Sequence, residues 1–125
     1  PGVILGKDVI PKQDNRTVSQ IDLAPTLLSL IGLETRNPMI GNDLTNENAP
    51  QRAMMQFDKN FAYMEKEQVA ILQPSKEPMY FRYAPQNKQL VESNHNEELG
   101  EKALAHALFG SKAYEKSWYR LENNN

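Results

Sequence analysis

The chain has 125 residues and a formal net charge of −2, a length that fits one domain or a domain with a small appendage. It contains no cysteine, which excludes disulfides, thiolate metal sites and a cysteine nucleophile. It shows no basic stripe and no apolar run near 18 residues, so we expect neither charge-driven nucleic-acid binding nor a membrane span in this segment. The hydrophobic share of 39% and the mean hydropathy of −0.67 predict a globular piece with a modest core. Because the chain starts at Pro1 without an initiator Met, we expect it to be excised from something longer.

The first elements expected are a short strand and a loop. Residues 1–5 are apolar and are followed by Gly6, which predicts a short buried strand. Residues 7–16 are polar and carry Pro11, Asp14 and Asn15, residues that favour turns, so we expect a loop there.

A helix is expected next. Ser19 and Asp22 are three residues apart, as in a capping box with Asp in place of Glu. Pro25 suits a first helical turn, where its missing N–H has no partner in any case. We therefore expect the helix to begin near residues 22–24 and to end at Gly32 as its C′ residue.

This helix is apolar over roughly half of its circumference, wider than the ~100° stripe of a surface helix. A helix of this kind needs packing partners on two sides, and the rest of the chain is short. The apolar side chains are Ile21, Leu23, Ala24, Leu27, Leu28, Leu30 and Ile31.

From residue 51 onward the sequence changes to short apolar runs separated by turn formers, which predicts an antiparallel meander. The expected strands are Arg52–Phe57, Phe61–Glu65, Gln68–Gln73, Met79–Tyr83 and Lys88–Val91. A last helix follows, capped by Asn94 or Asn96, with an apolar stripe over residues 99–108. Gly110 is expected to stop or kink this helix.

The sequence offers little catalytic chemistry. None of the common nucleophile, phosphate-loop, dinucleotide or zinc-protease motifs is present. His95 lacks partner ligands and His106 is expected to be a solvated histidine on the flank of the last helix. Asp22 is interpreted as a helix cap rather than as a catalytic carboxylate.

The candidates for contact with a substrate lie near one hairpin. Lys59 and Asn60 are in the expected turn after the first strand, and Tyr63 follows closely. A cation, an amide and an aromatic ring can form a binding rim. The plainer alternative is a solvated turn whose aromatic residues pack on the sheet.

One segment carries a specific resemblance. The run Val18-Ser-Gln-Ile-Asp-Leu-Ala-Pro-Thr-Leu-Leu-Ser-Leu-Ile-Gly32, followed by Gly41-Asn-Asp-Leu44, resembles the C-terminal part of the sulfatase family, in the alkaline phosphatase superfamily. The later segments 52–56, 60–63, 69–74 and 101–108 are similar to the Gram-negative lipoteichoic-acid-synthase-like branch, whose members resemble phosphoglycerol transferases.

The resemblance implies a parent enzyme that acts on phosphate or sulfate esters in the cell envelope. Such a parent has a Thr, Ser or formylglycine nucleophile and a divalent metal (Mn, Ca, Mg or Zn), and it is held in the inner membrane with its catalytic domain facing the periplasm. The nucleophile and metal ligands lie upstream of this segment in the family, so no catalytic or metal-binding residue and no cofactor is expected here. The motif residues Ser19, Asp22, Pro25, Thr26, Gly32 and Gly41 are expected to be structural.

The fold class expected is α+β: the C-terminal piece of an α/β sulfatase-like fold, with a buried strand and apolar helix, then a four- to five-stranded antiparallel meander and a C-terminal helix. Residues 1–48 are expected to end the α/β core and residues 49–125 to form a C-terminal subdomain. The expected partner is the upstream catalytic domain of the same polypeptide, and the isolated chain should self-associate. The alternative function is an independent protein-interaction module.

Overall fold

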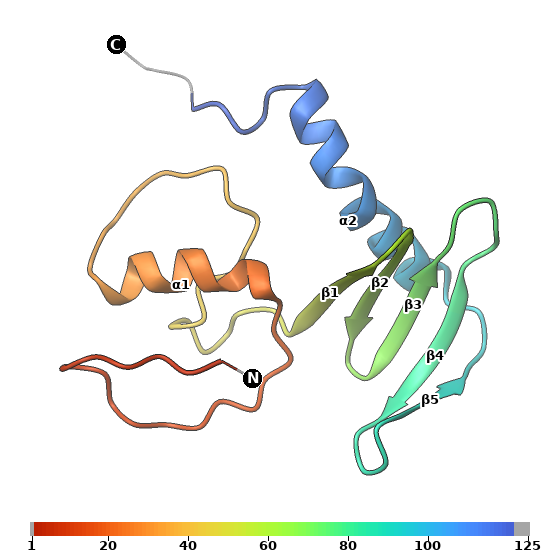
Figure 1. Cartoon of the computed structure of the whole chain (residues 1–125), viewed down its shortest axis with the longest axis horizontal. Coiled ribbons are helices and arrows are strands. Elements are labelled where there is room, and N and C mark those ends of the chain that lie inside the picture. The colour runs from red at the N-terminus through yellow and green to blue at the C-terminus, as the bar shows by residue number, and fades with distance from the viewer. Residues whose placement is uncertain (1, 122–125) are drawn as a thin grey trace.

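The computed structural model describes residues 2–121 and shows an α+β fold in which one helix covers one face of an antiparallel sheet (Figure 1). None of the helices within these residues is both long and apolar enough to cross a membrane. The elements in chain order are the 3₁₀ turn η1 (Gln20–Asp22), helix α1 (Leu23–Leu30), strands β1 (Arg52–Phe57), β2 (Asn60–Glu65), β3 (Gln68–Leu72), β4 (Met79–Ala84) and β5 (Gln89–Glu92), and helix α2 (Glu97–Glu115).

The sheet confirms the predicted meander. Its five strands lie in the order β1-β2-β3-β4-β5, every neighbouring pair is antiparallel, and the strand bounds fall close to those expected. The turn between β2 and β3 shows why the local sequence was enough to predict this hairpin. Lys66 and Glu67 have φ values of 48° and 64°, and a two-residue turn with two positive φ angles matches the twist of the flanking strands.

The core lies between α2 and one face of the sheet. Tyr63, Ala70 and Tyr80 face each other across β2, β3 and β4, and they pack with Leu99 and Ala103 of α2. Small residues on the helix let it lie close to the two tyrosine rings. The opposite face of the sheet has no helix packed on it within the described residues (Figure 1).

Helix α2 confirms one prediction and contradicts another. Asn96 is the N-cap, because its side chain accepts a hydrogen bond from the Leu99 N–H at 3.1 Å. Gly110 neither stops nor kinks the helix, which runs on to Glu115. A glycine inside a helix costs only about 1 kcal/mol relative to alanine, and that cost is too small to end a helix whose neighbouring residues favour it.

Helix α1 ends as expected at Gly32, which has a φ of 72°. The N–H groups of Gly32 and Leu33 donate to the carbonyls of Ser29 and Leu28, the pair of bonds that defines a Schellman cap. The buried strand predicted for residues 1–5 is wrong over residues 2–5, which form no strand, and Pro1 lies outside the described residues. A strand needs a neighbour to pair with, and none lies beside this segment; Leu5 is 89% exposed.

Residues 33–51 cross beneath η1 as an irregular segment, and Gly41 is the point of closest approach. A Cβ atom at Gly41 would overlap the carbonyl oxygen of Ile21 and lie 3.1 Å from the Cα of Asp22. Backbone atoms cannot move aside as a flexible side chain can, so this crossing requires glycine.

We predict opposite effects for two glycine substitutions. Gly41→Ala should lower the free energy of unfolding by about 2 kcal/mol or more, because the backbone crossing must open. Gly110→Ala should raise it by about 0.5–1 kcal/mol, because nothing lies near its Cβ position and alanine favours the helix. Urea unfolding of the three proteins measures both, and a destabilised Gly110→Ala protein would contradict the account of α2.

Candidate functional site

A buried ion pair joins the N-terminal third of the chain to the sheet. The Asp22 carboxylate, at the start of α1, is fully buried, and Arg52, the first residue of β1, is nearly so. Both Arg52 Nη atoms donate to the carboxylate, one to each Oδ atom, at 3.0 Å. This two-point contact fixes both the distance and the orientation of the two elements.

The carboxylate of Asp22 has a complete set of hydrogen-bond donors. The backbone N–H of Ser19 donates to Oδ2 at 2.8 Å and the N–H of Asn42 donates to Oδ1 at 2.7 Å. Burial alone would raise the pKa of Asp22, but the hydrogen bonds from Arg52, Asn42 and Ser19 outweigh it and hold the pKa below its usual value. The group is therefore a buried anion at neutral pH.

Two hydroxyl groups, of Ser19 and Thr26, add to these contacts. We call the contacts of Ser19, Asp22, Thr26 and Arg52 together the polar joint. The Ser19 Oγ accepts a hydrogen bond from the Met54 N–H at 2.7 Å, and this N–H lies on the outer edge of β1, the first strand of the sheet. The Thr26 Oγ1 donates to the Asp22 carbonyl and accepts from the Leu44 N–H at 3.0 Å. Helix α1, the segment after Gly41 and the sheet edge are thus held by polar contacts.

The structure places four of the six motif residues at this joint. Ser19, Asp22 and Thr26 form the joint, Gly41 lies against its backbone, Pro25 is in the first turn of α1 and Gly32 ends that helix. The sequence interpretation of Asp22 as a helix cap missed its main contact, which is Arg52. The two residues are 30 positions apart, and no local pattern links them.

The three candidate rim residues are not brought together. Lys59 and Asn60 lie at the β1–β2 turn, and Lys59 is exposed. Tyr63 is 5% exposed and packs in the core under α2, where its hydroxyl donates to the Glu65 Oε2 at 3.2 Å. Tyr63 therefore does not belong to a surface rim with the other two. A substrate contact by Lys59 and Asn60 stays a prediction.

His106 is packed rather than solvated, which corrects the sequence interpretation. Its ring stacks on Tyr63 with centroids 5.0 Å apart. Burial there, with the nearby positive charge of Arg52, lowers the pKa of His106. The imidazole is therefore mainly neutral at pH 7 and serves as part of the packing between α2 and the sheet.

The hollows near the start of α2 do not assemble a reaction site. One, of about 140 Å³, is bordered by Glu65, Glu98 and Lys102, and the Lys102 Nζ pairs with both carboxylates at 3.0 and 2.9 Å. The other borders His95, whose ring meets the edge of Tyr80. No three His, Cys, Asp or Glu side chains come together within residues 2–121 as a metal site.

A set of exposed large apolar side chains lies on α1 and on the segments before and after it in the chain. Leu27 is 41% exposed and Ile31 is 72% exposed, although both belong to the apolar side of the helix. We call this the α1 face. Its other exposed large side chains are Val3, Leu5, Ile10, Leu23, Leu30 and Leu33.

The chain is similar to part of a larger protein of known structure. No family model matches the chain. A solved structure described as a protein in the alkaline phosphatase superfamily, from Vibrio parahaemolyticus, is 41% identical in sequence and superposes with a TM-score of 0.87. The match covers 94% of this chain and 29% of that chain, so the chain spans under a third of the length of this similar protein. The similarity supports the resemblance at the level of the superfamily and confirms the α+β fold class; it does not address the phosphoglycerol-transferase branch.

We predict that Asp22→Asn lowers the free energy of unfolding at pH 7 by about 3–5 kcal/mol, because it leaves the Arg52 guanidinium buried without a counter-charge. In the unchanged protein the pKa of Asp22 is lowered, so its ionised carboxylate stabilises the folded state fully at pH values above the ordinary pKa of 3.8. This stabilisation is lost as the pH falls below that value. Stability of Asp22→Asn should therefore depend less on pH between about pH 5 and pH 2.

Urea unfolding at several pH values measures both effects. Asp58→Asn is the matched control, because it removes one carboxylate from a turn with a φ of 52°, which asparagine tolerates. Equal stability losses in the two variants would contradict a special role for the buried pair.

Proposed function

We propose that this chain is a non-catalytic segment of a metal-dependent enzyme in the alkaline phosphatase superfamily, and that it completes the fold of that enzyme. The support is the 41% identity over 94% of the chain together with a span of only 29% of the similar protein.

In finer detail, we propose a phosphoglycerol-transferase-like parent that acts on phosphate or sulfate esters. The upstream catalytic domain would hold the nucleophile and the divalent metal, which activates the nucleophile and neutralises charge on the transferred group. The parent would be held in the inner membrane with this segment on the periplasmic side. The residues of this chain would position and cover that domain rather than react.

The observation that carries the proposal is the α1 face. A large aliphatic side chain gains about 1.5–3 kcal/mol when it is fully buried, so several half-exposed leucines and isoleucines represent a gain comparable with the total stability of a small domain. The polar joint holds α1 in one orientation on the sheet edge, and the apolar side of the helix is then presented outward as a preformed surface for the catalytic domain.

The alternative, an independent interaction module, has one observation in its favour. The sheet and α2 have a core of their own, built around Tyr63, Tyr80 and Leu99. The exposed α1 face favours the hypothesis that the chain is a segment of an enzyme over the hypothesis of an independent module. A module that folds alone rarely leaves so large an apolar surface uncovered.

We predict that the isolated chain self-associates through the α1 face. Light scattering with size-exclusion chromatography over a hundredfold dilution should show dimers or larger species that dissociate on dilution. Leu27→Lys with Ile31→Lys should shift the chain to a monomer. Leu90→Lys, at a similarly exposed apolar position on β5, is the control and should leave self-association unchanged. A monomer at every concentration would count against the proposal.

A chimera tests the enzyme segment directly. In the chimera this chain replaces the matched 29% of the Vibrio parahaemolyticus protein. We predict that the chimera is monodisperse and unfolds as one cooperative unit. It should also retain any metal-dependent hydrolysis of nitrophenyl phosphates or sulfates that the unchanged Vibrio parahaemolyticus protein shows. The α1-face double variant should disrupt the chimera and Leu90→Lys should not. Metal-dependent turnover by the isolated chain would overturn the non-catalytic role.

A further inference from the structure

The end of α2 and the turn that follows it form a cluster of exposed aromatic side chains. We call residues 109–121 the α2 tip. Tyr114 is 77% exposed and Trp118 is 55% exposed, whereas aromatic rings of this size are usually well covered. Tyr119 and Leu121 are also about half exposed. The cluster therefore needs an explanation other than packing within this chain.

The backbone holds these rings in place. Ser117 has a φ of 56°, and the Trp118 N–H donates to the Ala113 carbonyl at 3.0 Å, which closes a Schellman cap at the end of the helix. The Trp118 ring then lies against Phe109 with centroids 6.0 Å apart, and Tyr119 stacks on Tyr114 at 6.3 Å. The aromatic surface is preformed, with its rings already paired.

The α2 tip is also positively charged. It carries Lys112, Lys116 and Arg120 against the single carboxylate of Glu115, a local net charge of +2 in a chain of net charge −2. Lys112 and Lys116 share that carboxylate at 3.0 and 3.3 Å, and Arg120 lies over the Tyr119 ring at 5.7 Å. Cations and aromatic rings thus occupy the same small surface.

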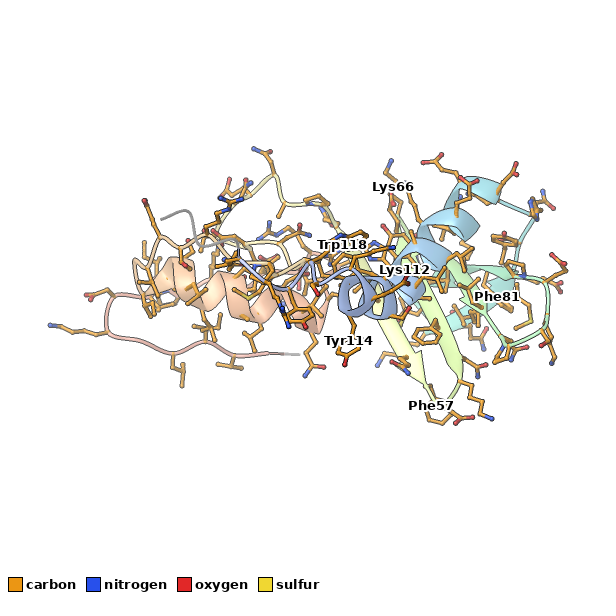
Figure 2. The ribbon with its side chains drawn as sticks, turned by 90° about the horizontal axis from the view of Figure 1, so that it is seen from above. Phe57, Lys66, Phe81, Lys112, Tyr114 and Trp118 are labelled. Atoms are coloured by element: carbon orange, nitrogen blue, oxygen red, sulfur yellow. The ribbon has the colours of Figure 1, made fainter. Side chains whose placement is uncertain are left out.

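The position of the α2 tip suits contact with a broad, flat partner. The helix projects past the sheet, so its end forms an extremity of the fold (Figure 1). Seen from above, along the direction in which the helix projects, Lys112, Tyr114 and Trp118 surround that end (Figure 2). Because it lies at an extremity, this end of the helix can reach a planar surface.

We propose that the α2 tip docks onto an anionic lipid surface. Trp and Tyr prefer the interface of a bilayer, where the ring is apolar and the N–H or O–H stays hydrated. Lys and Arg are drawn to the negative potential of anionic headgroups. We commit to the lipid surface because the local net charge of +2 complements anionic headgroups and the exposed rings suit the bilayer interface. The inference does not rest on the proposed enzyme segment.

The experiment uses the full chain and vesicles of phosphatidylglycerol and phosphatidylcholine in equal parts, with pure phosphatidylcholine vesicles for comparison. Trp118 is the only tryptophan of the chain, so its emission reports on the α2 tip alone. We expect the chain to float with the anionic vesicles and the emission to shift to the blue. Binding should weaken at least tenfold when NaCl rises from about 0.05 to 0.5 M, because salt screens the attraction.

Two triple variants separate the α2 tip from the general charge of the chain. Lys112→Gln, Lys116→Gln and Arg120→Gln together should reduce the apparent affinity for anionic vesicles at least tenfold. Lys12→Gln, Lys66→Gln and Lys88→Gln change the net charge equally at exposed sites elsewhere and should reduce it less than threefold.

Four outcomes would overturn the proposal. These are no flotation with anionic vesicles at low salt, equal binding to both kinds of vesicle, flotation without a change in Trp118 emission, and equal losses in the two triple variants. The third outcome would assign vesicle contact to another surface, and the first would leave a protein as the occupant of the α2 tip. None of these outcomes bears on the chimera, so the two proposals fail independently.

Discussion

The Asp22–Arg52 ion pair is the interaction on which the arrangement of this chain depends. Taking a carboxylate and a guanidinium out of water carries a desolvation cost that their attraction offsets only when the geometry is good and the remaining hydrogen bonds are made. Here the carboxylate receives two bonds from Arg52 and two from backbone N–H groups. A wrong placement of α1 on the sheet edge would leave two buried charges unsatisfied, so the pair selects one arrangement.

The two parts of the chain are stabilised by different physics. Around α2 the stability comes from apolar burial, with Tyr63, Ala70 and Tyr80 packed against Leu99 and Ala103. Around α1 it comes from the polar joint, while the apolar side of the helix stays exposed. Polar contacts give direction, and apolar burial gives most of the free energy. The N-terminal third is thus held in a defined orientation, but its apolar side chains are still exposed to solvent.

The sequence predicted those features whose cause is local. The strands followed from short apolar runs between turn formers, and the ends of α1 followed from Pro25 and Gly32. Most of the errors concern causes that lie far along the chain; the exception is Gly110, where the local cost of a helical glycine was given too much weight. The strand expected at residues 1–5 lacks a neighbour, and the partner of Asp22 is 30 residues away. Whether the domain boundary falls at residue 48 stays a prediction.

Tyr63 shows a further limit of sequence reasoning. Strand β2 is apolar on both faces, since Ala62 and Met64 alternate with Phe61 and Tyr63. Alternation alone cannot tell which face α2 covers.

The open surfaces follow from the way the joint is built. A buried ion pair adds specificity more than stability, so a segment held by one must obtain free energy elsewhere. The core around α2 is small, with five residues in its buried cluster, and the α1 face has large apolar side chains that are still uncovered. Covering Leu27, Leu30 and Ile31 would add burial without moving the joint, because Asp22 and Thr26 are already buried in contacts of their own. The ion pair sets the position of α1, and whatever covers the α1 face adds the stability that the pair does not supply.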